Sequence, residues 1–289
     1  MSITTKYLFD QYCNNIELGI PDIRVENIID DVCDAIQQKC NRTFETAIYQ
    51  EWVDGSQQNY LFLKNYPITA IMRVADSAIN VLNITNTGNE YAAVTANSTG
   101  ITLNTTDSLG VTTETELLYA DYVNVGLLNT AINLIATWSS EVVSDYSSKL
   151  TSFIKPKWGE NIYDNTNIQL VVPYQSVSVR VADSSNNAIE RVDGCGFPGG
   201  HSNIYVNYTA GYTLPVDNDQ HSDLTVEGNV PKGLVLIANQ ICKDVIDGVS
   251  NDKNMKDETI GNYKYVRGAI LSCVDRHWAD LQPYALKVI

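Results

Sequence analysis

The side chains with the greatest capacity for chemistry in this sequence are its three histidines, six cysteines and 34 carboxylates. The histidines lie at His201, His221 and His277, without the H-x-x-x-H or H-E-x-x-H spacing that places two imidazoles on one helical face around zinc. The cysteines are scattered without C-x-x-C spacing, which argues against both a zinc site and a disulfide framework. We therefore expect no metal site and no cofactor.

Two further segments look like chemical motifs. The glycine-rich run 194–200 lacks a following Lys-Ser/Thr and a helix that could bind a phosphate, so it indicates a loop, and no pattern places its Cys195 beside His201. Asp30, Asp31 and Asp34 span one turn of a predicted helix, which is more typical of a solvated face than of a calcium site. No G-x-S-x-G sequence occurs. The sequence predicts a protein without catalytic residues, not an enzyme.

The composition is that of an acidic globular protein, with 44% hydrophobic residues, a net charge of -15 and an isoelectric point near 4.5. Wrapping nucleic acid requires clustered Lys and Arg, so this class of function is not expected. The longest uninterrupted apolar stretch runs from Leu234 to Ala238, far short of the roughly 20 residues that a membrane helix needs. The first residues also lack the pattern of a secretory signal. We expect no membrane partner.

Helical periodicity is strongest near the two ends of the chain. Apolar residues from Val25 to Cys40 recur at helical spacing, and a shorter helix is expected around residues 5–13. Pro231 stands in the first turn of a second long helix, whose apolar face runs from Leu234 to Ile246. Residues 269–279 are a further helix candidate.

Strand patterns occupy most of the remaining chain. Residues 48–53 and 59–63 predict a hairpin about Asp54-Gly55. A helical stripe over residues 127–138 and a second helix over 141–150 interrupt the β pattern. Short alternating runs predict further strands at 71–74, 91–94, 100–103, 117–119, 169–172, 177–181 and 203–208.

Together these patterns predict an α+β fold: a helical core from both chain ends with a β-hairpin, plus an inserted β-rich domain containing one or two helices. We expect residues 1–75 and 202–289 to form the core and residues 76–201 to form the inserted domain. The 289 residues suffice for one large or two modest domains.

Four separated stretches, in their order along the chain, resemble the head-to-tail connector (adaptor) family of tailed bacteriophages. They are Cys40-Asn41-Arg42-Thr43-Phe44 after a helix; Glu51-Trp52-Val53-Asp54-Gly55 with Leu63-Lys64-Asn65-Tyr66-Pro67-Ile68; Val206 to Tyr212, followed by Pro231; and Glu258 to Tyr265 with the closing Leu281-Gln282-Pro283-Tyr284. Together they cover about half of the chain. Family members are usually shorter, so the middle of this chain looks like an insertion.

The resemblance implies a structural virion protein that forms a ring, a homododecamer, under the portal vertex. It implies portal protein on one side, a stopper, tail or nozzle protein on the other, and an axial channel through which DNA passes without specific binding. The acidic balance suits such a channel, because a negative lumen repels phosphates. The implied location is the virion neck, after assembly in the bacterial host cytoplasm.

The C-terminal segment 258–289 is the expected contact with the portal. Residues 250–258 are polar and charged, which would leave the following residues loosely tethered. Burial against a partner would be worth about 1.5–3 kcal/mol for each large side chain. The predicted docking residues are Ile260, Gly261, Tyr263, Tyr265, Trp278, Leu281, Pro283 and Tyr284. The other interpretation is that residues 269–279 pack on the protein's own helices as core.

A second class of function stays open. The 17 tyrosines and four tryptophans favour subunit interfaces in a ring. They also suit a carbohydrate- or receptor-binding β-rich phage tail protein, in which residues 76–201 would carry the function.

Overall fold

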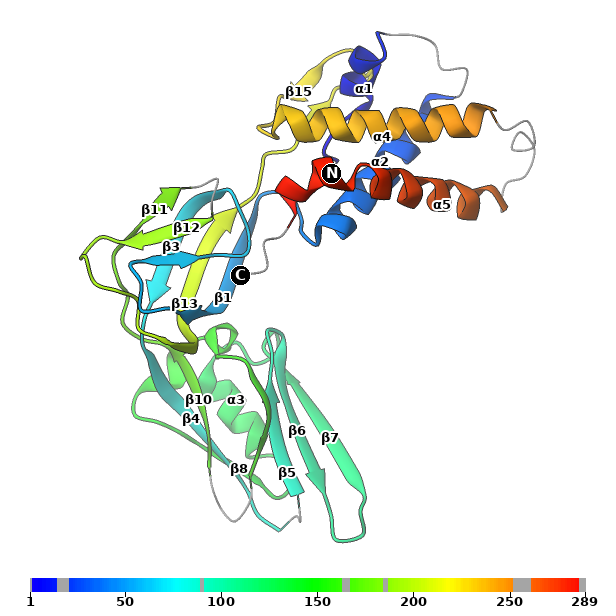
Figure 1. The fold of residues 1–289 in the computed structure, drawn as a ribbon. Helices are drawn as coiled ribbons and strands as arrows, with labels where there is room; N and C mark the ends of the chain where they lie inside the picture. The colour runs from blue at the N-terminus through cyan, green and yellow to red at the C-terminus, as the bar shows by residue number, and fades with distance from the viewer. Residues whose placement is uncertain are drawn as a thin grey trace.

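The computed structural model describes residues 2–14, 21–88, 91–162, 167–183, 187–251 and 261–285. Within them the buried hydrophobic side chains form three clusters. We call these the helical, central β and distal clusters, and they follow one another from the top to the bottom of Figure 1.

The helical cluster contains buried residues from both parts of the chain that flank the strands, 3–44 and 214–281. Its helices are α1 (Lys6–Tyr12), α2 (Asp22–Cys40), α4 (Lys232–Asn251), α5 (Gly261–Arg276) and α6 (Trp278–Leu281), followed by the 3-10 turn η4 (Gln282–Tyr284). The two-residue strand β14 (Val216–Asp217) and β15 (Leu224–Val226) form a small hairpin beside α1. Helix α2 ends where Asn41 adopts the left-handed conformation, with φ of 52°.

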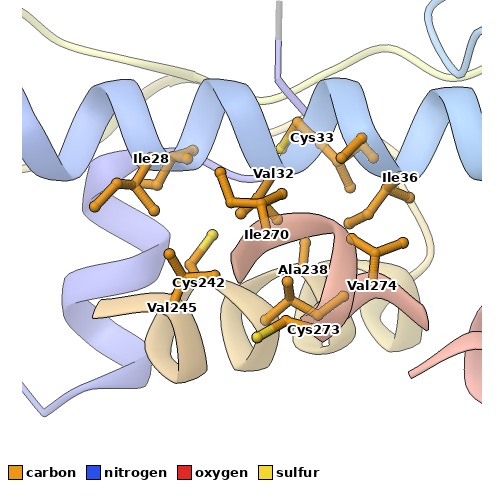
Figure 2. Packing of buried hydrophobic residues seen from close by; sticks show 14 of the residues in the cluster. Ile28, Val32, Cys33, Ile36, Ala238, Cys242, Val245, Ile270, Cys273 and Val274 are labelled. Carbon is orange, nitrogen blue, oxygen red and sulfur yellow. The ribbon is translucent and has the colours of Figure 1, made fainter. Parts of the chain in front are cut away.

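The predicted apolar faces of the two long helices meet in this cluster. Figure 2 shows Ile28, Val32 and Ile36 of α2 facing Ala238 and Val245 of α4, with α5 completing the contact. The cysteines at these helix contacts are free and act as small hydrophobic side chains. Burial raises the pKa of the Cys33 thiol to about 11, so this group stays neutral and unreactive.

The central β cluster contains buried residues from 61–74 and 189–210. One of its sheets has the order β1-β13-β3 and the other has the order β11-β12-β2, all antiparallel. The strands are β1 (Ala47–Gly55), β2 (Tyr60–Phe62), β3 (Ile68–Ala75), β11 (Val179–Asp183), β12 (Ala188–Arg191) and β13 (Gly200–Ala210). The long β13 lies in the middle because its alternate residues Ile204, Val206 and Tyr208 are fully buried.

The predicted hairpin about Asp54-Gly55 is wrong in its pairing. Strand β1 pairs with β13, and β2 pairs with β12, so the two adjacent strands belong to different sheets. Gly55 serves a different purpose from a tight turn: a Cβ at this position would lie 1.7 Å from the Pro198 carbonyl oxygen. The residue is needed for the close approach of the segment before β13.

The distal cluster is formed by residues between Val81 and Val172. Its sheets have the orders β10-β4-β8 and β7-β6-β5-β9. The elements are β4 (Ala78–Asn86), β5 (Tyr91–Ala96), β6 (Gly100–Thr106), β7 (Thr112–Leu118), α3 (Val125–Ile132), β8 (Trp138–Val142), η1 (Tyr146–Ser148), η2 (Thr151–Phe153), β9 (Lys157–Asn161) and β10 (Ile168–Pro173). Helix α3 packs on this cluster through Val125, Leu128 and Ile132.

The helix predicted over 141–150 is absent. Strand β8 and the turn η1 occupy these residues, and helix α3 ends well before Trp138. The Asn133 side chain accepts a hydrogen bond from the Ser140 backbone N–H at 2.7 Å and donates one to the Ser140 carbonyl at 3.0 Å. These bonds turn the chain back after α3 and place residues 138–142 against β4.

The predicted α+β class, with a helical core from both chain ends, is wrong for this chain. Strands take 38% of the residues, and the described chain has 15 strands in five small antiparallel sheets beside short helices. The helices make only one of three clusters, because the strand residues bury their own apolar faces in the other two. The central β cluster also joins residues from both sides of the expected boundaries after 75 and 201, so hydrophobic packing divides the chain differently.

Candidate functional site

The C-terminal segment packs on the protein's own helices over residues 270–285. Leu281 is fully buried in the helical cluster, and Trp278 and Tyr284 pack against it. The Lys39 ammonium lies 5.2 Å from the centre of the Trp278 ring and 2.6 Å from the Asp275 carboxylate. The expectation of a loosely tethered arm is therefore wrong for this stretch.

The remaining predicted docking residues are distributed along the same segment. Gly261 begins α5, and Tyr263 and Tyr265 follow it in the first turns of that helix. Ile260 lies outside the described residues. Pro283, in η4, is exposed at the surface. The structure therefore brings Trp278, Leu281, Pro283 and Tyr284 together.

An open groove of about 660 Å³ lies between α4 and the C-terminal segment. It is lined by Gly233, Leu236, Ile237, Gln240, His277, Ala279, Asp280 and Pro283. Leu236 is 53% exposed although it lies in a largely apolar lining. An acidic side chain, Asp280, borders the groove and is 66% exposed. The groove thus combines a largely apolar lining with an exposed carboxylate at its border.

His277 connects the two walls of this groove. Its Nε2 lies 3.2 Å from Asp244 on α4, and its Nδ1 lies 3.7 Å from Asp280 on α6. Arg276 approaches the same Asp244 carboxylate at 3.6 Å. This polar bridge holds the C-terminal segment against α4 beside the apolar lining.

A buried arginine lies at the joint between the helical and central β clusters. Arg42 follows α2, is 7% exposed, and donates hydrogen bonds to the carbonyl oxygens of Tyr66 and Tyr284, the second at 3.3 Å. Its guanidinium carbon lies 3.9 Å from the centre of the Tyr66 ring and 4.8 Å from that of Phe44. Carbonyl dipoles and ring faces therefore surround this cation, an arrangement suited to a planar guanidinium. We call it the Arg42 joint.

The chain that leaves β13 and returns to the helical cluster passes through the Arg42 joint. Tyr212 stacks on Phe44 with ring centres 6.5 Å apart, and its backbone N–H donates to the Phe44 carbonyl at 2.7 Å. Gly211 has φ of 115°, and a Cβ there would lie 2.4 Å from the Glu45 carbonyl oxygen. Only glycine fits this crossing. Burial raises the pKa of the Tyr212 hydroxyl above its ordinary value.

The Arg42 joint brings together residues from all four stretches that carry the family resemblance. They are Arg42 and Phe44, Tyr66, Gly211 and Tyr212, and Tyr284. No pattern in the sequence marks Arg42 as a functional residue. The available signal was an arginine directly after a helix, two positions from each of the apolar residues Cys40 and Phe44, and arginine rarely lies in a core.

The histidines and the exposed cysteine that the sequence offered as candidates lie at separate places in the fold. His221 contacts Glu26 at 2.9 Å and Asp217 at 3.0 Å, so both of its ring nitrogens face carboxylates. His201 lies 2.9 Å from Asp54, and Cys195 is exposed. Within the described ranges, no group of three or more His, Cys, Asp or Glu side chains is arranged to hold a metal ion.

The distal cluster carries one unusual exposed aromatic residue. Trp158 on the edge strand β9 is 80% exposed. The next residue, Gly159, donates its backbone N–H to the Thr95 hydroxyl at 3.1 Å. Strand pairing extends this row across the sheet to Thr102 and Glu116. This row of the sheet is therefore polar, with one large exposed aromatic ring at the sheet edge.

No protein-family model and no curated protein matches this sequence. No helix in the part of the chain that the structure describes is long and apolar enough to cross a membrane.

Proposed function

We propose that this chain is a structural virion protein, a ring-forming adaptor between the portal vertex and the tail of a tailed bacteriophage. The observation that supports the proposal is the Arg42 joint, where the four stretches that resemble the connector family meet. These four stretches lie far apart in the sequence, and their residues together build this one structural feature. A closed ring, of twelve copies, requires the repeated head-to-tail interface that cyclic symmetry provides.

The ring is tested by electron microscopy of the purified chain with its candidate portal protein. We expect a closed ring of this protein on the portal, with an open axial channel. Any arrangement other than a closed ring in that complex contradicts the proposal. A monomer in the absence of portal does not, because docking can supply the template for assembly.

The groove between α4 and the C-terminal segment is the proposed portal contact. Its occupant would be an apolar portal segment with a basic side chain that pairs with Asp280, which is exposed at the border. Leu236→Lys places a cation in the groove and should weaken portal binding at least about tenfold, equivalent to about 1.4 kcal/mol. Leu271→Lys is the matched control, since Leu271 is 47% exposed but lies outside the groove. Equal binding by the two variants would exclude the groove.

The proposed channel also requires that the protein does not retain DNA. With 34 acidic and 19 basic residues, the chain should give no gel shift with duplex DNA near physiological salt. A shift that weakens steeply with added salt would indicate phosphate contacts and would contradict a channel that lets DNA pass freely.

The exposed Trp158 at the edge of the β7-β6-β5-β9 sheet favours a second candidate function, binding of a carbohydrate receptor. Trp158 offers an apolar ring face, and Glu114 and Glu116 have no ion-pair partner among the described residues. A glycan array probed with the whole chain tests this candidate. Binding that Trp158→Ala abolishes, without a change in the melting temperature, would favour a receptor-binding tail protein over the adaptor.

A further inference from the structure

The last described residues of the chain lie across the Arg42 joint. The Tyr66 hydroxyl donates to the Ala285 carbonyl at 2.9 Å and approaches the Pro283 carbonyl at 3.4 Å. Arg42 donates to the Tyr284 carbonyl between them. Three successive backbone carbonyls are thus held by side chains from elsewhere in the chain.

The two donors belong to different parts of the fold. Arg42 directly follows α2 of the helical cluster, whereas Tyr66 lies between β2 and β3 and is 5% exposed. Tyr284 itself packs on the helical cluster, and its hydroxyl lies so near Gly233 of α4 that a Cβ there would be 2.7 Å away. Residues 282–285 therefore contact both parts at once.

The covalent connections between these two parts are few. The chain crosses between α2 and β1, through residues 41–46, and again after β13, through residues 211–214. The crossing segments contact each other through the Thr46 N–H and the Tyr212 carbonyl at 3.0 Å. Two adjacent crossings restrain the separation of the helical and central β clusters more than the rotation of one cluster relative to the other. They can therefore act as a hinge. A further contact outside these two crossings is needed to fix the angle between the two clusters.

We propose that residues 282–285 are a strap that fixes the orientation of the helical cluster relative to the central β cluster, with Tyr66 as its positioning residue. The strap is held mainly through backbone carbonyls, so it depends on the donors Tyr66 and Arg42 more than on its own side chains. This device is independent of the proposed adaptor function and goes beyond it. In a ring, the same angle would set the direction in which each subunit faces its neighbours.

The strap is tested by the distance between two spin labels, one on each part. Cys195 of the central β region is the exposed cysteine of the chain, and the other five are buried. Asn27→Cys on the exposed face of α2 supplies the second site. Pulsed electron resonance on the full chain should give one narrow distance distribution.

Tyr66→Phe removes the hydroxyl that holds the strap and leaves the ring. We expect a shifted and broader distance distribution, with unchanged helix and strand content by circular dichroism. Tyr60→Phe is the matched control, because Tyr60 is 44% exposed on β2 and should leave the distribution unchanged. An unchanged distribution in folded Tyr66→Phe would overturn the proposal.

A second variant decides the matter if Tyr66→Phe does not fold. Ending the chain after Leu281 removes all three carbonyl acceptors but keeps the buried Leu281. We expect this variant to retain its secondary structure and to show the broader distribution. Loss of secondary structure in both variants would count against a strap, since the proposal requires each part to keep its own core.

Discussion

Two joints connect the three clusters, and different non-covalent interactions hold each joint together. At the Arg42 joint, a buried cation satisfies backbone carbonyls from two distant segments. At the joint between the central β and distal clusters, the Tyr205 ring packs edge-on between Trp52 and Phe153, with ring centres 5.5 and 5.8 Å apart. The Lys155 ammonium lies 5.5 Å from the centre of the Trp52 ring. We call this second site the Trp52 joint.

The Trp52 joint also has an arginine, and its setting differs. Arg73 donates to the carbonyls of Pro173 and Tyr174 at 3.1 Å and to the Ser176 hydroxyl at 3.2 Å, but these bonds are partly open to solvent. Two chain segments cross here, after β3 and after β10, and a single isolated antiparallel bridge joins Ala75 to Ser176. Water can replace Arg73 in these bonds, whereas the Tyr66 carbonyl that Arg42 holds is buried. The comparison teaches that burial, and not the number of bonds, decides how much a joint depends on its arginine.

Arg42→Met should have the largest effect. It removes the donor to the buried Tyr66 carbonyl and to the partly buried Tyr284 carbonyl, and a buried acceptor left unsatisfied costs about 1–3 kcal/mol. We expect the free energy of unfolding to fall by about 3 kcal/mol in urea denaturation followed by circular dichroism. Arg42→Lys keeps the charge without the planar fork and should recover only part of this loss. A loss no larger than that of Arg73→Ala would remove the distinction between the joints.

Gly211→Ala tests whether the Arg42 joint is also sterically closed. The added Cβ would meet the Glu45 carbonyl at 2.4 Å in a backbone conformation that alanine rarely adopts. We expect a loss of about 2 kcal/mol in the same measurement. The control is Gly248→Ala in α4, where a Cβ meets nothing within 4 Å and helix propensity should add about 0.5–1 kcal/mol. Similar changes in both variants would show that the crossing has room to adjust.

Arg73→Ala should cost less, about 1 kcal/mol, because solvent replaces its hydrogen bonds at the Trp52 joint. The bridge between Ala75 and Ser176 and the aromatic contacts should keep the central β and distal clusters in place. The thermal melting curve measures the loss, and the near-ultraviolet signal of Trp52 reports whether the joint stays packed. A collapse of that signal would show that Arg73, and not the aromatic group, holds the joint.

The smallest expected effect concerns a third arginine, Arg191. It pairs with carboxylates, so its contribution to stability depends on pH. Arg191 contacts Asp76 at 2.7 Å and Asp193 at 2.5 Å. The guanidinium and the Cys195 N–H lower the pKa of Asp193 from 3.8 to about 2. Because the folded-state pKa is depressed, its stabilisation is present above about pH 4 and is lost as the pH falls toward 2.

Asp193→Asn removes this titrating group. Between pH 4 and pH 2, the melting temperature of the variant should fall less steeply than that of the unmodified protein. Neither Arg42 nor Arg73 bonds to a carboxylate among the described residues, so Arg42→Met should leave the slope in this window unchanged. Parallel slopes for the Asp193→Asn variant and the unmodified protein would show that the pair contributes nothing to acid stability.

Local sequence patterns were sufficient to predict the helices and strands that bury one face along their whole length. The spacing from Val25 to Cys40 specified α2, Pro231 marked the start of α4, and the alternation of Ile204, Val206 and Tyr208 specified β13. These signals are local because each element must bury one face, whatever it packs against. The sequence likewise indicated that the cysteines at the helix contacts are apolar side chains.

Only the tertiary structure decided which faces meet. Strand β1 has the aromatic and β-branched residues typical of a strand, but its partner β13 lies about 150 residues away, and no local signal selects it over β2. Residues 141–150 have enough apolar groups for a helix, yet the pairing of β8 with β4 takes Glu141 and Val142, and the turn η1 takes Tyr146–Ser148. The role of Arg42 was hidden for the same reason. The carbonyls that bind it belong to residues 66 and 284, and an arginine becomes a buried joint only where distant chain segments bring such acceptors together.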